Sequence, residues 1–346
     1  MTSTAQLFLI FSTMLGTVIT LSSSHWFLAW IGLEINTLAF VPLIVMKQHP
    51  RAIEAAIKYL LTQATASAII LFSTFVHALA YGEWDISYMS VSMAIPLSIA
   101  LCMKLGLAPF HFWYTDVLQG IPLTLGLMLS TWQKIAPMAL LIQISDLTNF
   151  TIMTFLGVLS ILVGGWGGIN QTQLRKIFAY SSIAHMGWMI IILKLSIHLT
   201  LFTFITYLIL TLALFLNMIM LNMTTLTQFS TAWSKSPALS LTTLLIILST
   251  AGMPPLTGFV PKLLISLELA KTSPLLVGLL FLISLLSLYF YLRLIYTIIL
   301  TTPPLTTPHA TTWRPTQNLP PMISIINIMA IMLLPLTPTT LSVIYF

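Results

Sequence analysis

Residues 238–270 read ALSLTTLLIILSTAGMPPLTGFVPKLLISLELA, an apolar run longer than the roughly 20 residues that cross a bilayer as one helix. Five residues that disfavour helix interrupt it: Gly252, Pro254, Pro255, Gly258 and Pro261. Proline removes a backbone donor and clashes with the preceding helical turn. Irregular backbone at membrane depth is tolerated only where it faces protein or a watery cavity. The run therefore predicts a broken transmembrane helix with Lys262 beside the break, as in transporters whose ion site lies between half-helices.

The composition of the whole chain indicates the same class of protein. Of the 346 residues, 58% are hydrophobic and 6% are charged, and the mean hydropathy is +1.01. A soluble domain carries about a quarter charged residues, and disorder requires low hydrophobicity, so both classes are excluded. The net charge of +6 comes from scattered basic residues, which is not the footprint of a nucleic-acid-binding protein.

Apolar stretches recur along the chain at the length of membrane spans. We count about eleven, near 3–22, 26–46, 57–80, 89–110, 122–144, 150–170, 176–194, 199–222, 238–270, 274–299 and 322–345. The first has neither a basic flank nor a small-residue cleavage site, so it is predicted to be a span rather than a signal peptide. The fold class is all-α: one polytopic integral membrane domain over residues 1–346. The Thr- and Pro-rich residues 300–320 are predicted to be a surface loop between the last two spans.

Basic residues predict the orientation of these spans. Most of them fall in connections that follow even-numbered spans. They are Lys47, Arg51, Lys58, Arg175, Lys176, Lys235, Arg293 and Arg314. Connections after odd-numbered spans hold only Lys194 and Lys271. The positive-inside rule then places the N-terminus on the inner side and Phe346 on the outer side.

The sequence offers no site for a redox group or a nucleotide. The single cysteine, Cys102, excludes a disulfide within the chain. It also excludes an iron–sulfur cluster, which needs about four thiolates. There is no GxGxxG and no P-loop motif. The GGWGG at 164–168 lies inside an apolar stretch and predicts close helix packing instead. We therefore expect the chain to bind no cofactor and no metal.

A few ionisable residues remain near the middle of predicted spans. They are Glu34, Lys104, Lys134 and Lys262, joined by His111 and His185. A charge at the bilayer centre costs about 3 kcal/mol on insertion scales. Buried ion pairs are the alternative explanation, but three lysines cannot all be neutralised by one glutamate.

The types of these residues favour proton handling. Burial can move the pKa of lysine, glutamate or histidine into the range where each gains and loses protons near neutral pH. Arginine stays protonated, and a voltage sensor would use repeated arginines. A sodium site would use buried Asp, Asn or bare carbonyls, and no Asp lies at mid-span.

Local context refines this prediction. In KLGLAPFHFW, residues 104–113, Pro109 should break the helix, with His111 about two helical turns beyond Lys104. His111 then serves either the proton path or merely a helix end. We expect Glu34 within about 6 Å of Lys104, since a lone buried carboxylate would otherwise protonate.

The motif AYSSIAHMGW, residues 179–188, places His185 one turn after Ser181 and Ser182. These groups could form a water-linked relay or a structural hydrogen-bond cluster, and both interpretations stay open. We predict that His185 and waters span the gap between Lys134 and Lys262.

Five segments together resemble a known family. They are SSHWFLAWIGLEINTLA at 23–39, HPRAIEAAIKYLLTQATAS at 49–67, KLGLAPFHFW at 104–113, NQTQLRKIFAYSSIAHMGW at 170–188 and AGMPPLTGFVPK at 251–262. The chain is similar over nearly its whole length to the mitochondrially encoded, antiporter-like subunits of respiratory complex I, the NADH–ubiquinone oxidoreductase. Larger relatives have fourteen spans built on two inverted five-helix repeats. This sequence resembles the animal form that lacks the first three helices.

The resemblance implies a function and its residues. The proton-relay positions of the family match Glu34 in WIGLE, Lys104 in KLG, Lys134 in WQK and Lys262 in GFVPK. His111 and His185 match further polar positions. The implied role is a core membrane-arm subunit of a proton-pumping NADH:ubiquinone reductase. Its NADH, FMN, iron–sulfur and ubiquinone sites would lie on other subunits.

The resemblance also implies the location and the partners. The location is the mitochondrial inner membrane, with the N-terminus on the matrix side and the C-terminus in the intermembrane space. Partners would be other membrane-arm and accessory subunits and the lipid bilayer, with cardiolipin as one candidate lipid, but no nucleic acid. Two alternatives stay open: a self-standing cation/proton antiporter, and a structural membrane subunit whose buried charges are inert.

Overall fold

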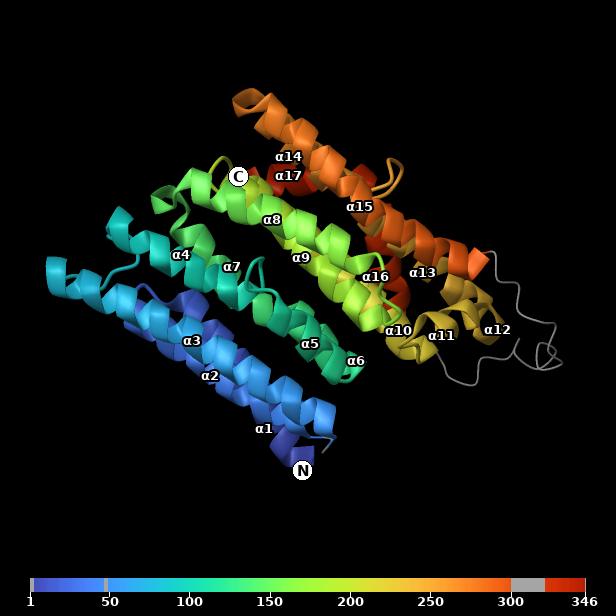
Figure 1. Ribbon diagram of the computed structural model, residues 1–346, viewed down its shortest axis with the longest axis horizontal. Coiled ribbons are helices and arrows are strands. Elements are labelled where there is room, and N and C mark those ends of the chain that lie inside the picture. Colours follow the sequence, from blue (N-terminus) through green and yellow to red (C-terminus); the bar gives the residue numbers. More distant parts are fainter. Residues whose placement is uncertain (1–2, 47–48, 300–320, 346) are drawn as a thin grey trace. The chain divides into compact units, whose positions relative to one another are not determined.

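The computed structural model describes residues 3–46, 49–299 and 321–345, and this part of the chain is helical with no strand (Figure 1). The all-α prediction is therefore confirmed for these residues. The chain divides into two compact units, residues 1–160 and 161–346. The predicted loop at 300–320 and the terminal Phe346 lie outside the described residues. The single membrane domain over residues 1–346 stays a prediction.

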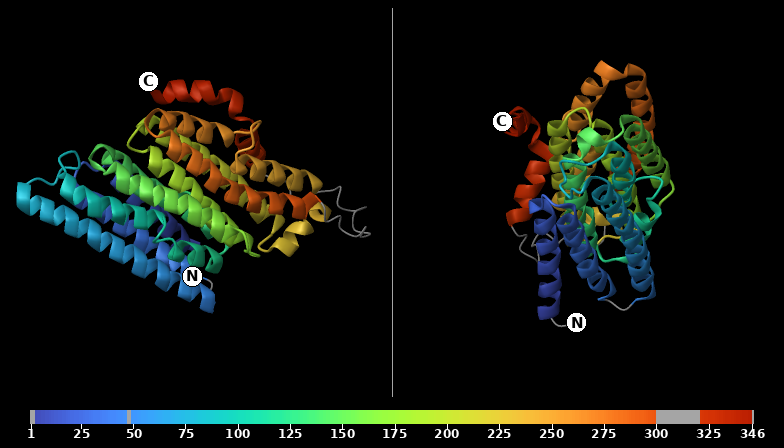
Figure 2. Two further views of the ribbon diagram at one scale, coloured as in Figure 1. Left: turned by 45° about the horizontal axis from the view of Figure 1, so that its top comes forward. Right: turned by 90° about the vertical axis from the view of Figure 1, so that its left-hand side faces the viewer.

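The first unit contains the helices α1 (Ser3–Ser22), α2 (Trp26–Val45), α3 (Pro50–Tyr81), α4 (Val91–Leu105), α5 (Phe112–Gly120), α6 (Leu123–Ser130) and α7 (Trp132–Gln143), the short η1 (Ser145–Leu147) and the start of α8 (Phe150–Gly168). Helices α2 and α3 run side by side in Figures 1 and 2. Helix α1 packs closely on α2 because two glycines meet there. A Cβ atom on Gly32 would lie 2.8 Å from the carbonyl oxygen of Gly16. Small residues give membrane helices this close approach.

Helix α3 begins seven residues before the predicted span of 57–80. The side chain of His49 caps it by accepting the Arg51 N–H at 3.3 Å, and Pro50 occupies the first helical position, where no backbone donor is needed. The assignment of Arg51 and Lys58 to a connection was therefore wrong. Both residues lie in the first turns of a 32-residue helix.

The second unit contains the rest of α8 and the helices α9 (Leu174–Ile192), α10 (Ile197–Leu221), α11 (Leu226–Ser230), α12 (Ala232–Lys235), α13 (Pro237–Ala251), α14 (Phe259–Thr272), α15 (Pro274–Ile299), α16 (Pro321–Met332), η3 (Leu334–Leu336) and α17 (Thr337–Tyr345). The predicted packing role of GGWGG is confirmed. A Cβ on Gly164 would lie 2.7 Å from the Tyr180 carbonyl oxygen, and one on Gly168 would lie 2.8 Å from the Phe290 ring. These glycines thus seat α8 against α9 and α15.

Seven helical segments in the described ranges are long and apolar enough to cross a membrane. Several of the predicted spans are instead divided. In the stretch 89–110, the helix ends at Leu105. The stretch 322–345 is divided into α16 and α17, which Figure 2 shows running in different directions. Helix α5 was not predicted. Glycine and proline interrupt these stretches, and a count of spans from hydropathy alone does not detect the interruptions.

Candidate functional site

The first break in a helix lies between α4 and α5. Helix α4 ends at Leu105, Gly106 takes the left-handed conformation with φ 76°, and the next helix starts at Phe112. The predicted break at Pro109 is confirmed. A side chain at Gly106 would also crowd Tyr114, since its Cβ would lie 3.0 Å from the Tyr114 Cβ. The break therefore holds the end of α4 tightly against α5.

Lys104 lies in the last turn of α4, beside this break. Its side chain is 5% exposed, and its ammonium nitrogen finds no hydrogen-bond partner in the described part of the chain. A buried ammonium without partners is a costly arrangement, because it has given up its hydration.

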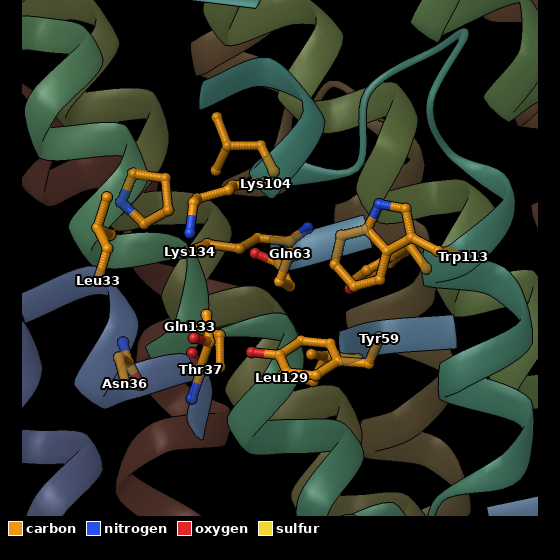
Figure 3. A pocket seen from close by; sticks show the side chains of 13 residues that line it. Leu33, Asn36, Thr37, Tyr59, Gln63, Lys104, Trp113, Leu129, Gln133 and Lys134 are labelled. Atoms are coloured by element: carbon orange, nitrogen blue, oxygen red, sulfur yellow. The ribbon is translucent and has the colours of Figure 1, made fainter. Parts of the chain in front are cut away.

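Lys104 shares a cavity with Lys134, which we call the Lys104–Lys134 cavity (Figure 3). Six helices, α2 to α7, contribute to its lining. The residues are Leu33, Asn36, Thr37, Tyr59, Gln63, Lys104, Leu105, Trp113, Tyr114, Leu129, Gln133, Lys134 and Pro137. Its volume of about 20 Å³ suits about one water. Three amide side chains and three hydroxyl groups are among its lining residues.

Lys134 comes from the start of α7, after an interruption at Thr131 that separates α6 from α7. The lysine is 3% exposed, and its ammonium nitrogen lies 4.6 Å from the centre of the Tyr114 ring. A cation over an aromatic face gains about 2 kcal/mol or more when desolvated. Two lysines in one cavity repel when both are charged, so their protonation is coupled.

Glu34 does not line the cavity. It is partly exposed, and its carboxylate accepts a hydrogen bond from the Thr37 hydroxyl at 3.2 Å. Its charge acts on Lys104, although no ion pair joins the two residues within the described ranges. The separation of about 6 Å stays a prediction.

His111 caps the break rather than facing the cavity. It precedes α5, its ring stands 4.1 Å from the ring of Phe112, and it makes a hydrogen bond with the Pro109 backbone. It is absent from the lining of the Lys104–Lys134 cavity. This placement favours the helix-end interpretation of His111.

The second break, between α13 and α14, lies in the second unit. Helix α13 ends at Ala251, Gly252 is left-handed with φ 89°, and α14 starts at Phe259. The prediction of a break at this position is confirmed. A Cβ on Gly258 would fall 1.8 Å from the Ser249 carbonyl oxygen, so only glycine lets the connection pass this close to α13.

Lys262 closes the end of the half-helix α13. Its ammonium nitrogen donates to the Ala251 carbonyl at 2.7 Å, across the break. The carbonyls at a helix C-terminus lack helical partners and carry the negative end of the helix dipole. A positive charge is therefore stabilised there, and the break supplies a counter-charge where no carboxylate of the described residues forms an ion pair with Lys262.

Lys262 and His185 line a second cavity, which we call the Lys262–His185 cavity. Its volume is about 30 Å³, enough for about two waters. The other residues are Trp188, Met189, Thr203, Thr206, Tyr207, Leu210, Gly258, Pro261 and Ile265. The His185 ring lies 5.9 Å from the ring of Tyr207. A titratable imidazole thus faces the same space as the lysine.

Ser181 does not join this cavity. Its hydroxyl donates to the Phe178 carbonyl at 2.8 Å and also pairs with the Tyr291 hydroxyl, which in turn pairs with Thr250. These contacts tie α9, α15 and α13 together as a structural cluster. Lys134 and Lys262 belong to different units, so the His185 bridge between them stays a prediction.

Sequence reasoning missed the uncharged polar residues of the Lys104–Lys134 cavity. Tyr59 and Gln63 are buried on α3, and Asn36 is buried on α2. A signal was present: Tyr59, Gln63 and Ser67 recur every four residues in an apolar helix, which places them on one face. A search restricted to charged residues passes over that face.

Comparison with known proteins identifies close relatives. The NADH:quinone oxidoreductase/Mrp antiporter transmembrane family matches residues 23–287, and the NADH dehydrogenase subunit 2 C-terminal family matches residues 288–341. NADH-ubiquinone oxidoreductase chain 2 of Aquarana catesbeiana is 58% identical over 332 residues, covering 95% of this chain and 96% of that protein. The protein of the same name from Formosania lacustris is 53% identical over 340 residues, covering 97% and 98%.

Among solved structures, a chain of respiratory complex I from Thermus thermophilus, with bound aureothin, superposes with a TM-score of 0.81 at 28% identity. The match covers 94% of this chain and 76% of that one. These matches confirm the resemblance indicated by the sequence motifs.

Proposed function

Because the chain belongs to the NADH:quinone oxidoreductase/Mrp antiporter transmembrane family, we propose that it is a proton-translocating membrane subunit of an NADH–ubiquinone oxidoreductase complex. The redox reaction takes place on other subunits, which hold the NADH, FMN, iron–sulfur and ubiquinone sites. This chain contributes the membrane part of the pump. Its partners are other membrane-arm and accessory subunits and the surrounding lipid, with cardiolipin as one candidate.

The observation that carries the proposal is a buried lysine beside a helix break in each unit. Lys104 stands at the end of α4 and Lys262 crosses the end of α13, and each lines a small cavity. A purely structural subunit has no use for a buried ammonium group that forms no ion pair in the described part of the chain. A proton carrier needs such a group, because its charge must be easy to remove.

In the first unit, charge repulsion couples the protonation of Lys104 to that of Lys134. Both lysines line one cavity of about 20 Å³, and two positive charges close together in a low dielectric repel each other. A proton arriving on one lysine therefore favours release from the other. Gln63 and Gln133 supply donors and acceptors between them through the cavity.

In the second unit, Lys262 holds its proton against the Ala251 carbonyl. When the lysine gives up the proton, the charge that stabilised the end of α13 is lost. His185, across the same cavity, is the acceptor whose ordinary pKa of about 6.5 suits transfer near neutral pH. The site residues of the proposal are Glu34, Lys104, Lys134, Lys262 and His185, with His111 at the first break.

We further propose the mitochondrial inner membrane as the location, with the N-terminus in the matrix and the C-terminus in the intermembrane space. Basic residues near the ends of even-numbered spans support this orientation. The whole chain, residues 1–346, then acts as one integral membrane domain.

Replacing Lys134 with methionine in the assembled complex tests the function. Methionine keeps an unbranched side chain of nearly the same length and has no group that binds a proton, so protons translocated per NADH oxidised should fall. Lys271→Met is the matched control, because Lys271 is exposed and pairs with Glu268 of the same helix. A yield equal to that of the parent would favour the structural alternative. Ion exchange by the isolated, reconstituted chain would favour the self-standing antiporter.

A further inference from the structure

A buried tyrosine of α15 joins the two helices that hold the parts of the Lys262–His185 site. Tyr291 is 2% exposed, and its hydroxyl group pairs with Ser181 on α9 and with Thr250 on α13. All three residues belong to the second unit. They are not among the described residues that line the Lys262–His185 cavity, so the lysine relay does not use them.

Each hydrogen-bond partner of this phenol lies close in sequence to a part of the site. Thr250 directly precedes Ala251, whose carbonyl oxygen accepts the 2.7 Å hydrogen bond from the Lys262 ammonium group. Ser181 lies four residues before His185 on α9, which is about one helical turn, or ~6 Å along the helix axis. One hydroxyl group thus connects the acceptor that holds the lysine with the helix that carries the imidazole.

The two partner hydroxyl groups have fixed positions on their own helices. The Ser181 hydroxyl donates to the Phe178 carbonyl at 2.8 Å, and the Thr250 hydroxyl donates to the Ile247 carbonyl at 2.8 Å. A hydroxyl oxygen has two acceptor lone pairs in addition to its single hydrogen, so each can also bond the phenol. A shift of α13 relative to α9 would therefore stretch a bond to Tyr291.

The connection between α13 and α14 is fixed at its far end as well. Thr257 is 3% exposed, and its hydroxyl donates to the Ala330 carbonyl of α16 at 2.5 Å. This contact positions the start of α14, the helix that carries Lys262. Tyr291 positions the end of α13, the helix that carries the carbonyl acceptor. The distance between the lysine and its acceptor is thus controlled from both sides of the break.

Both contacts are supplied by the C-terminal part of the chain. Tyr291 and Ala330 lie in the segment that matches the NADH dehydrogenase subunit 2 C-terminal family, residues 288–341. The residues that they hold, Thr250 and Thr257, lie in the segment that matches the antiporter family, residues 23–287. The C-terminal segment therefore completes a site whose titratable residues all precede it.

We propose that Tyr291 is a positioning residue for proton transfer between Lys262 and His185. The inference rests on the proposed function. Through Thr250, the phenol keeps the end of α13 where its last carbonyl meets the ammonium group. Through Ser181, it keeps α9 where the imidazole shares the cavity with the lysine. The phenol itself neither gains nor loses a proton.

Replacing Tyr291 with phenylalanine in the assembled complex tests this role. The variant keeps the buried ring and removes the hydroxyl group, while the two partner hydroxyls keep the bonds to their own helices. Tyr289→Phe is the matched control, because Tyr289 lies on the same helix and is 57% exposed. Proton translocation and NADH oxidation are measured in sealed vesicles as a function of pH. The midpoint of thermal inactivation is measured on the same complexes.

We expect Tyr291→Phe to slow translocation by about two- to tenfold, which is the effect of one hydrogen bond on an equilibrium. The loss should be largest at high pH, where protons are scarce and a displaced carbonyl no longer stabilises the ammonium form of Lys262. His185 and Tyr207 are the other titratable side chains in the lining of the cavity, and neither is changed. Tyr289→Phe should match the parent at every pH.

A lower midpoint of thermal inactivation, with the translocation rate equal to that of the parent at every pH, would overturn the inference. A hydroxyl group with a merely structural role has that effect. Thr250→Val covers the case in which Tyr291→Phe does not assemble, because it removes only the partner on α13 and should change the pH profile in the same direction. The double variant should be no slower than Tyr291→Phe alone, and additive slowing would contradict action through this contact.

Lys262→Met in the same preparations separates this inference from the proposed function. If Lys262→Met lowers the protons translocated per NADH and Tyr291→Phe does not, the proposed function stands and the positioning role fails. If Lys262→Met leaves the yield unchanged, the proposed function fails, and the positioning role fails with it.

Discussion

Replacing Gly252 with alanine should displace Lys262 from the end of α13. Gly252 has φ 89°, and a left-handed residue other than glycine costs about 1–2 kcal/mol. The new Cβ would lie 3.0 Å from both Cδ and Nζ of Lys262, so the lysine must move. Losing its 2.7 Å bond to the Ala251 carbonyl removes about 1.5–3 kcal/mol more. The total weakening of the break is then about 2.5–5 kcal/mol.

Gly82→Ala separates the two contributions. Gly82 also has a positive φ, 75°, but a Cβ there meets nothing within 4 Å. This control carries the backbone strain alone, about 1–2 kcal/mol. Hydrogen exchange of the amides at 248–256, compared with those at 78–84, reports the local opening free energy at each site. Proton translocation by the same complexes reports the function.

We expect exchange at the α13–α14 break to accelerate at least tenfold more in Gly252→Ala than exchange at the end of α3 does in Gly82→Ala. Translocation should fall in Gly252→Ala only. Equal acceleration at both sites, with pumping unchanged in both variants, would refute the role given to the Lys262–Ala251 contact.

Three further changes test other parts of the fold. His185→Leu should lower protons pumped per NADH if the imidazole serves the relay, and an unchanged yield would leave the lysines as independent sites. Gly32→Leu should block assembly, seen as loss of the intact complex on native gels, because even a Cβ at this position would lie 2.8 Å from the Gly16 carbonyl oxygen. Asn217→Leu should lower the midpoint of thermal inactivation by stranding buried Asn327, which bonds it at 3.0 Å. The double variant with Asn327→Leu should recover much of that loss, and failure to recover would contradict the pairing.

Proline and glycine made both breaks predictable. At the second break, five such residues within ten positions prevent a continuous helix, and Lys262 is the next residue. The effect is local, since it depends on φ and on missing backbone donors. The interruption between α6 and α7 occurs at Thr131, which is neither glycine nor proline, so the sequence did not predict it.

Which side chains share a cavity was much harder to predict. Pairing Lys104 with Lys134 depends on how α4 and α7 pack, and packing is decided by many contacts at once. The free-energy cost of burying a charge identified both lysines in the sequence, but it did not predict how far apart they lie. Gln63 was missed because an uncharged amide does not appear in a search for buried charges. Its four-residue spacing from Tyr59 nevertheless places both residues on one helical face.

The length of α3 has a consequence for the membrane surface. Its 32 residues extend about 48 Å, whereas the hydrocarbon core is about 30 Å thick. Even a tilt of about 40°, the upper end of the usual range, lengthens the crossing only to ~39 Å. At least ~9 Å of helix therefore stands in the headgroup layer. Arg51, Glu54 and Lys58 mark the N-terminal turns as the part that stands there, because charges avoid hydrocarbon. These side chains therefore lie among lipid headgroups and water rather than in hydrocarbon.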